Sequence, residues 1–428
     1  MATIYKNVNI LDGTKNMKLQ KDMMVTVSGG KIASIKKNDP SVEGIDCNGK
    51  YMIPGLINLH IHTPASGFPK KKQADSKKLA KLVMSNPVTQ LIGKYLVSSA
   101  CKTELLSGTT TVRAVGGLGH LDSEFRDKVS KSKAIGPRII SCDSAITVPG
   151  GHMEGSVAYG AKDDDDFVRF IAENVNAGVD WIKIMITGGV LDAKVKGEPG
   201  EMKMNPEQVK LCCETAHRLG KKVCAHVESP KGVEVAIMNG VDSIEHGSSM
   251  SDDLVKTLKE NKGILVSTLS PAVPLAKFDP SITGGNDIQR YNSEVLLEGI
   301  IDATKKCLKA GVKVGLGTDT GCPFVTHYDM WRELEYAHYL ADVDRDDCLY
   351  LATLNNAEIL GIDKETGSIE EGKLAEFMIV DDNPLDGFET IRKPSVVVFR
   401  DKVFNNPTVK KSEVAEKYLD EYLNTLKA

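Results

Sequence analysis

Eight short apolar runs, each followed by a polar or amphipathic stretch, most constrain how this chain can fold. Amphipathic helical patterns, such as those at 165–178 and 295–311, separate the runs. Strands that alternate with helices predict parallel βα units, and eight such units predict an α/β fold, a (β/α)8 TIM-like barrel. The runs lie at 52–60, 109–115, 137–141, 180–187, 221–227, 241–246, 263–268 and 312–319. An open doubly wound sheet is the alternative, but the Gly-x-Gly-x-x-Gly turn of its dinucleotide-binding form is missing.

The two ends of the chain differ from the middle in their residue pattern. Alternating, β-branched segments occur at 3–11, 23–35, 367–381 and 395–404. Such segments are typical of strands. We therefore expect a small β-sandwich domain built from both termini, with residues 1–52 and 361–428 flanking a barrel at 53–360. Two unrelated caps are the alternative. The last residues, 410–428, predict a polar helix that packs on the surface or against another subunit.

Charge and cysteine usage limit the partners that we expect. The 58 acidic and 54 basic residues give a net charge of −4, which provides no field for nucleic acid or anionic lipid. The nine cysteines are dispersed without a Cys-x-x-Cys pair, which indicates a reducing compartment. With no secretory signal and no apolar stretch of membrane-spanning length, we expect a cytoplasmic protein without nucleic-acid or membrane partners.

Two histidines lie at the end of the first apolar run. Residues two apart on a strand face the same side, so His60 and His62 point in one direction. They lie at the carboxyl end of the run, which in a barrel is the active-site face. Two imidazoles on one face suit a metal ion, although a His-x-His pair alone is a weak signal.

Three further strand candidates end in a side chain that can bind metal. His226, His246 and Asp319 close the runs at 221–227, 241–246 and 312–319. A single such residue could be a hydrogen-bonded polar group of the core. Four strands that end this way are hard to explain by packing, because imidazoles and carboxylates are costly to bury unpaired. Together they predict a metal site.

Lys183 lies inside an apolar strand candidate, between Ile182 and Ile184. A lysine there is costly unless it is paired, neutral or modified. The alternative is an outward-facing lysine whose amine reaches solvent between helices.

Two charged runs receive a structural interpretation. Asp163–Asp166 precede an amphipathic helix, where acidic residues favour the helix N-terminus, so we expect a solvated first turn there. Lys70–Lys72 are expected in an exposed loop.

The sequence resembles the amidohydrolase superfamily over nearly its whole length. The resemblance is carried by the ordered residues named above and by the segments 53–62, 244–247, 317–321 and 367–377. Its closest branch contains imidazolonepropionase-like proteins and metal-dependent, prolidase-like dipeptidases.

The resemblance implies two divalent cations, usually zinc. His60, His62 and Asp319 would hold the more buried cation, and His226 and His246 the more exposed one. Lys183 would be carbamylated by carbon dioxide and would bridge both. A metal-bridging hydroxide would attack the substrate carbonyl, with Asp319 as the catalytic proton shuttle.

Residues of the strand-end loops are candidates for substrate contact. The resemblance implies that His152, in a Gly-Gly-His loop, is a catalytic or substrate-contacting residue, and a surface histidine is the alternative. Glu228 could bind a cationic substrate group or cap the following helix. His327 is a weaker substrate-contact candidate in the last βα loop. The positions of His120 and Cys322 leave their roles open.

The expected enzyme is a metal-dependent amidohydrolase that cleaves a C–N amide bond in a small molecule, such as a dipeptide or an N-acyl amino acid. A cyclic-amide hydrolase, a lactonase or a deaminase on the same site remains an alternative, as does a non-catalytic assembly protein. The resemblance also implies a homo-oligomer.

Overall fold

The computed structural model describes residues 2–69 and 75–428, so the predicted loop at Lys70–Lys72 lies outside the described residues. The chain forms two compact units. One comprises Met1–Asn58, Lys102–Val112 and His327–Lys411, and the other Leu59–Cys101, Arg113–Thr326 and Ser412–Ala428. The domain boundaries expected at residues 52 and 360 stay predictions. Among the described residues, no helix combines the length and apolarity needed to cross a bilayer.

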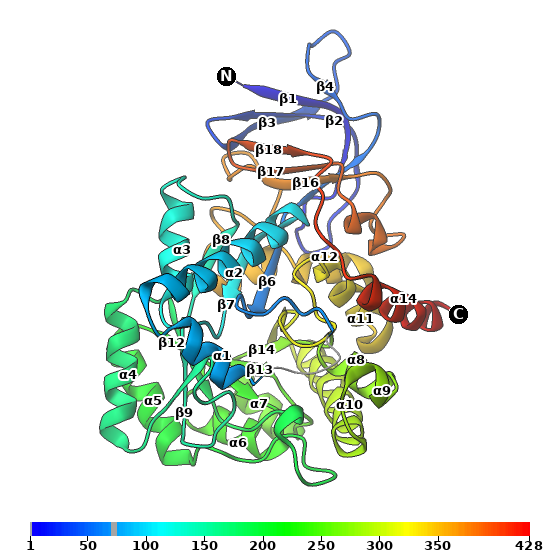
Figure 1. The fold of residues 1–428 in the computed structure, drawn as a ribbon. Helices are drawn as coiled ribbons and strands as arrows, with labels where there is room; N and C mark the ends of the chain where they lie inside the picture. The colour runs from blue at the N-terminus through cyan, green and yellow to red at the C-terminus, as the bar shows by residue number, and fades with distance from the viewer. Residues whose placement is uncertain (1, 70–74) are drawn as a thin grey trace. The chain divides into compact units, whose positions relative to one another are not determined.

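The first unit contains an eight-stranded sheet that joins both ends of the chain (Figure 1). Its strands are β1 (Thr3–Ile10), β2 (Gln20–Ser28), β3 (Lys31–Lys37), β4 (Ile45–Asp46), β5 (Tyr51–Pro54), β16 (Glu376–Val380), β17 (Val396–Phe399) and β18 (Lys402–Asn405). The antiparallel pairing of β5 with β16 makes the join, with Ile53 opposite Met378. The predicted folding of this domain into a sandwich stays a prediction.

The eight apolar runs of the sequence each contain all or most of one barrel strand. The strands are β6 (Leu56–Ile61), β7 (Thr109–Ala114), β8 (Arg138–Ser141), β11 (Trp181–Met185), β12 (Lys222–Val227), β13 (Ser243–His246), β14 (Ile264–Ser267) and β15 (Lys313–Leu316). β6, β7 and β8 form one sheet, and β11 to β15 form a second, parallel sheet with β9 (Ala145–Thr147) and β10 (Ala158–Gly160) at its edge. β6 and β7 contribute residues to both units.

Backbone hydrogen bonds connect the two barrel sheets on both sides. The Asp180 amide donates to the Ser141 carbonyl over 2.8 Å, which connects β8 to β11. On the other side, the Asp319 amide donates to the His60 carbonyl over 2.8 Å, which connects β15 to β6. The strands therefore close into a TIM-like barrel, and the expected fold class is confirmed at this level.

Helices follow the strands as the sequence pattern predicts. They are α1 (Ser76–Val83), α2 (Pro87–Leu106), α3 (Leu121–Ser130), α4 (Asp164–Asn176), α5 (Pro206–Arg218), α6 (Pro230–Met238), α7 (Asp252–Glu260), α8 (Ala272–Lys277), α9 (Pro280–Thr283), α10 (Asp287–Ala310), α11 (Met330–Ala341), α12 (Arg345–Leu351), α13 (Leu354–Leu360) and α14 (Glu413–Lys427). The terminal helix α14 packs on its own chain, where Ala415 and Leu419 join a cluster with Phe278 and Phe324.

The alternation of side chains along β11 decides where Lys183 points. Ile182 and Ile184 belong to the apolar layer that also contains Phe167 and Ile171 of α4. Because adjacent strand residues face opposite sides, Lys183 faces the barrel interior, where it is fully buried. The alternative of an outward-facing lysine is wrong.

The acidic run at 163–166 begins α4, as expected. Asp163 is the N-cap, and its carboxylate accepts a hydrogen bond of 2.9 Å from the Asp166 amide. Asp164, Asp165 and Asp166 occupy the first turn, where the helix dipole favours negative charge.

We predict that Asp163→Ala lowers the free energy of unfolding by about 1 kcal/mol, because a first-turn amide loses its acceptor. Denaturant unfolding followed by circular dichroism measures the loss. Asp165→Ala, which removes a first-turn charge without removing the cap, should cost less. A fall in bound metal on Asp163→Ala would contradict the capping assignment.

Candidate metal centre

Side chains from the carboxyl ends of the barrel strands form two adjacent groups. His60, His62 and Asp319 make one group, in which the candidate ligand atoms lie within 4.8 Å of one another. His226 and His246 make the second group together with Glu228, within the same limit. The His246 ring lies between the groups, with centroids 4.8 Å from His60 and 4.7 Å from His226. Five of the expected ligands, the four histidines and Asp319, therefore converge.

Backbone carbonyls fix which ring nitrogen of two histidines is free for a cation. Nδ1 of His62 lies 2.9 Å from the Gly116 oxygen, and Nε2 of His226 lies 3.2 Å from the Gly188 oxygen. A carbonyl oxygen only accepts, so these nitrogens are the donors. In each neutral ring the other nitrogen then carries a lone pair that can bind a metal.

Burial keeps two of the imidazoles in the neutral form that metals require. It lowers the pKa of His226 well below its usual value, and the neighbouring His152 and His246 add to the effect. The pKa of His246 is also lowered well below its usual value, first by burial and then by His60.

A buried carboxylate orients His60. Nδ1 of His60 donates to Glu245 Oε2 over 2.8 Å, and Arg113 Nη2 donates to Glu245 Oε1 over 2.6 Å. Burial alone would raise the pKa of Glu245, but Arg113 and His60 hold it far below its usual value. Sequence reasoning missed Glu245, although a charged residue inside an apolar strand was the signal that had identified Lys183.

Two of the ligand candidates have left-handed backbone conformations. The φ angle is +65° at His246 and +56° at Asp319. Such angles cost non-glycine residues about 1–2 kcal/mol. On a regular strand, the side chains of Glu245 and His246 would point to opposite sides. The left-handed backbone at His246 allows both side chains to face the site.

The carboxylate of Asp319 lies beside both histidines of the first strand. Its Oδ1 lies 3.3 Å from His60 Nε2 and 3.1 Å from His62 Nε2. Burial would raise the pKa of Asp319, but the charge of His60 and the proximity of both imidazoles hold it well below its usual value. The Cys322 thiol donates to Asp319 Oδ2 over 3.2 Å, and burial, with the charge of Asp319, raises the pKa of that thiol well above its usual value.

Lys183 brings an amine into this interior without a hydrogen-bond partner. Its side chain is 0 % exposed, and Nζ has no such partner among the described residues. An ammonium in this position would lack the compensation that a buried charge requires. Lys183 thus fits the requirement for a modified or neutral amine.

His152 is held beside the second group by an aspartate. Its ring stacks on that of His226 with a centroid distance of 4.2 Å and an interplanar angle of 11°. Asp192 accepts from His152 Nδ1 over 2.5 Å and from the Gly189 amide over 3.2 Å. His152 is therefore not a free surface histidine. No sequence signal pointed to Asp192, which lies in the 3-10 turn η1 (Val190–Asp192).

Glu228 does not cap the helix that follows it. The N-cap of α6 is Ser229, whose hydroxyl accepts from the Gly232 amide. Glu228 Oε2 instead accepts from the Val190 amide over 2.7 Å. Burial raises the pKa of Glu228 well above its usual value, and Asp319 and Asp192 add to the rise.

The site opens into a cavity with an empty volume of about 480 Å³, including the space open to solvent. Its polar lining residues include His152, His226, Glu228, His246, Asp319 and Cys322.

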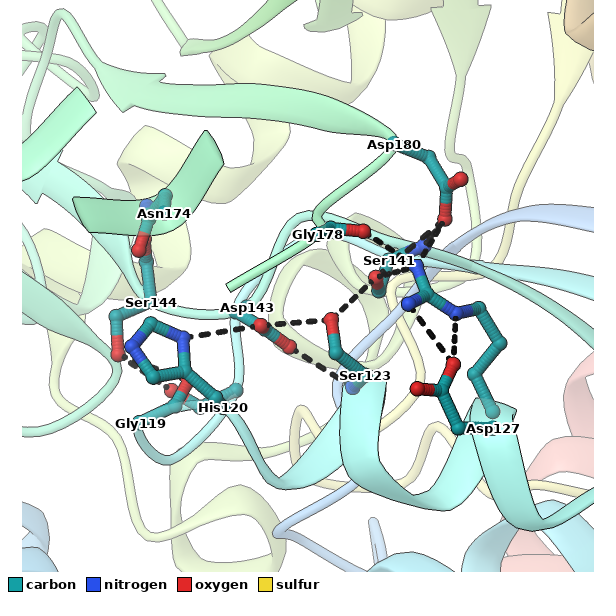
Figure 2. A network of polar contacts seen from close by, with 12 residues as sticks. Gly119, His120, Ser123, Asp127, Ser141, Asp143, Ser144, Asn174, Gly178 and Asp180 are labelled. Atoms are coloured by element: carbon teal, nitrogen blue, oxygen red, sulfur yellow. Dashed lines mark hydrogen bonds and ion pairs between the residues drawn. The ribbon is translucent and has the colours of Figure 1, made fainter. Parts of the chain in front are cut away.

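Two other histidines belong to separate polar networks. His120 Nδ1 donates to Asp143 Oδ2 over 3.1 Å, and Ser123 donates to the same oxygen over 2.8 Å (Figure 2). These contacts give His120 a structural partner. His327 lies in the other unit, where Nδ1 donates to Glu104 over 3.0 Å, so its contact with substrate stays a prediction.

We predict that Glu245→Gln weakens metal binding by about 10- to 100-fold, because His60 loses the carboxylate that orients it. Competition with a chelator measures the affinity. Glu260→Gln, an exposed replacement on α7, is the matched control. Unchanged affinity in Glu245→Gln would contradict this role.

Comparisons with known proteins agree with this geometry. Structurally, the chain is similar to a putative prolidase from Bifidobacterium longum, with a TM-score of 0.84, 31 % identity and coverage of 100 % of this chain and 99 % of that one. It is also similar to a Xaa-Pro dipeptidase crystallised with methionine, with a TM-score of 0.81, 26 % identity and coverage of 95 % and 100 %.

Sequence comparison leads to the same group of proteins. The ochratoxinase of Aspergillus niger is 25 % identical over 342 residues, which are 73 % of this chain and 69 % of the relative. The sequence model of the amidohydrolase family matches residues 51–411. The chain therefore belongs to the amidohydrolase family, and it is a metal-dependent hydrolase that acts on C–N bonds.

Proposed function

We propose that this enzyme is a binuclear amidohydrolase that cleaves the amide bond of a small substrate, a dipeptide or an N-acyl amino acid. The observation that carries the proposal is the convergence of four histidines and Asp319 at one end of a barrel whose interior also holds the Lys183 amine, which has no hydrogen-bond partner among the described residues. The names of the prolidase and Xaa-Pro dipeptidase structures support an amide of this size.

The donor set fits two divalent cations, with zinc the expected metal. His60, His62 and Asp319 would hold one, and His226 and His246 the other. Lys183 would add carbon dioxide at Nζ and lose a proton, which converts an unpaired buried amine into a carbamate anion that can bridge both. When bound, the cations would polarise the scissile carbonyl and make a water molecule more acidic.

Asp319 is the proton-transfer residue in this proposal. Its carboxylate would accept a proton from the attacking water and pass it to the nitrogen of the scissile bond. One water molecule is consumed, the C–N bond breaks, and the products are a carboxylate and an amine. The position of Asp319 beside His60 and His62 supports this assignment, because it places the carboxylate next to the proposed metal site.

His152 would contact the substrate, and Asp192 would position the His152 ring. With Nδ1 donating to Asp192, Nε2 is the nitrogen left for the cavity. With hydrogen on both ring nitrogens, a histidine held this way can donate to a substrate oxygen through Nε2. Its stacking on His226 keeps that nitrogen near the reacting carbonyl.

Lys183 also weighs against the deaminase alternative. The mononuclear deaminases of this superfamily generally lack a bridging lysine, whereas here the amine is fully buried and its charge acts on His226 and His246. Cyclic-amide hydrolysis and lactone hydrolysis would use the same donor set. A release assay across dipeptides, N-acyl amino acids, cyclic amides and lactones separates these reactions.

We predict that Lys183→Ala lowers metal content and removes hydrolysis together, because the cations lose their shared ligand. Elemental analysis of the sample used for the release assay measures both. Lys222→Ala is the matched control, since it removes an exposed lysine from the neighbouring strand. Survival of both metal occupancy and hydrolysis would show that the carbamate assignment is wrong.

We predict that Asp192→Asn lowers kcat/KM by about 10-fold or more, with metal content unchanged, because His152 loses its anionic partner. The same change in a His152→Ala background should have little further effect, since Asp192 acts through that ring. If Asp192→Asn lowered kcat/KM equally in the wild-type protein and in the His152→Ala variant, the positioning role would be contradicted.

A further inference from the structure

Glu228 places a carboxylate in the substrate cavity that the proposed chemistry does not use. The residue is 8 % exposed and lines the cavity beside His226 and His246. Its Oε2 accepts one hydrogen bond, from the Val190 amide over 2.7 Å. Its Oε1 lies 3.8 Å from His226 Nε2 and makes no hydrogen bond in the part of the chain that the structure describes.

The other acidic residue that lines the cavity, Asp319, already has close neighbours. Its Oδ1 lies 3.3 Å from His60 Nε2 and 3.1 Å from His62 Nε2. Among the described residues, Glu228 has one hydrogen-bond donor, the Val190 amide at Oε2, and Oε1 has none. An ammonium group entering the cavity would supply a donor to Oε1.

Most of the other side chains of the cavity wall are apolar. Pro271, Leu275, Leu296 and Ile300 line it and offer no acceptor, and the Ser293 hydroxyl donates to the Gln289 carbonyl. Outside the candidate metal ligands, Glu228 is therefore the anionic acceptor for a substrate cation, while the apolar side chains would contact hydrocarbon portions of the substrate.

We propose that Glu228 binds the α-ammonium group of the substrate, so that the site selects amides with a free α-amino group on the acyl side. This inference rests on the proposed function and decides between its two substrate classes, in favour of dipeptide-like molecules. Glu228 lies next to His226, at the proposed site of the scissile carbonyl. An α-ammonium is attached to the carbon next to that carbonyl, whereas a lysine side chain carries its ammonium several bonds away.

A matched substrate pair isolates this charge. The L-alanyl and isobutyryl amides of the same leaving amine differ only in that a methyl group replaces the α-ammonium. The leaving amine is taken from the best substrate of the release assay. Isobutyryl-lysine and isobutyryl-norleucine form a second pair, which tests an ammonium at the end of a side chain.

The wild-type enzyme should prefer the alanyl amide to the isobutyryl amide. Glu228→Gln should lower kcat/KM for the alanyl amide by about 10- to 100-fold, the range for loss of a charge-assisted hydrogen bond. Glu228→Gln should change kcat/KM for the isobutyryl amide by less than about threefold and leave metal content unchanged. Glu234→Gln, an exposed replacement on α6, is the control and should preserve the wild-type preference.

The remaining outcomes overturn the inference. Equal losses for both amides, or a fall in metal content, would identify Glu228 as a structural residue or a metal ligand with His226 and His246. A loss of kcat/KM confined to isobutyryl-lysine would show that Glu228 binds a side-chain ammonium instead. Hydrolysis of the isobutyryl amide without an alanyl preference would refute the selectivity alone. Hydrolysis of no amide by the metal-loaded protein would refute the proposed function as well.

Discussion

Lys183 places an amine inside the barrel, fully buried and without a hydrogen-bond partner among the described residues. Its position follows from strand alternation, because Ile182 and Ile184 occupy the outward face of β11 and pack against helices. A protein interior tolerates such a group when it is neutral, paired or modified. The neighbouring histidines and Asp319 supply a setting in which a modified, anionic lysine would face cations.

The barrel holds these ligands through contacts that reach one layer further into the core. Arg113 fixes Glu245, and Glu245 fixes the ring of His60. The close approach of two strands also helps to position the ligands. At Gly317, an added Cβ would lie 2.7 Å from the Cβ of His60. The absence of a side chain at Gly317 therefore lets β15 bring Asp319 within reach of the first strand. Sites supported by rigid strands keep the geometry that metal binding needs.

The alternating pattern of the sequence was sufficient for the barrel strands and for the residues at their ends. It worked because apolar runs followed by amphipathic helices have few solutions other than parallel βα units. At one point the pattern merged two strands. The run at 52–60 contains the end of β5 and most of β6, and the chain changes sheets at Gly55. An added Cβ there would lie 2.2 Å from the Thr110 side chain, a close approach that periodicity does not reveal.

The supporting residues of the site were not predictable in the same way. Asp192 lies forty positions from His152 in a short turn, and only the folded chain brings their side chains together. His246 and Asp319 reach the site through left-handed backbone conformations, which ordinary strand alternation does not anticipate. Glu228 could equally have been a helix cap, until the structure gave that position to Ser229.

The most direct test of the account is a crystal structure of the purified enzyme with anomalous diffraction data collected at the absorption edge of its bound metal. We predict two anomalous peaks, one beside His60, His62 and Asp319 and one beside His226 and His246, with electron density for a carbamate on Lys183 between them. A single peak, or an unmodified Lys183 that contacts neither ion, would contradict the binuclear assignment.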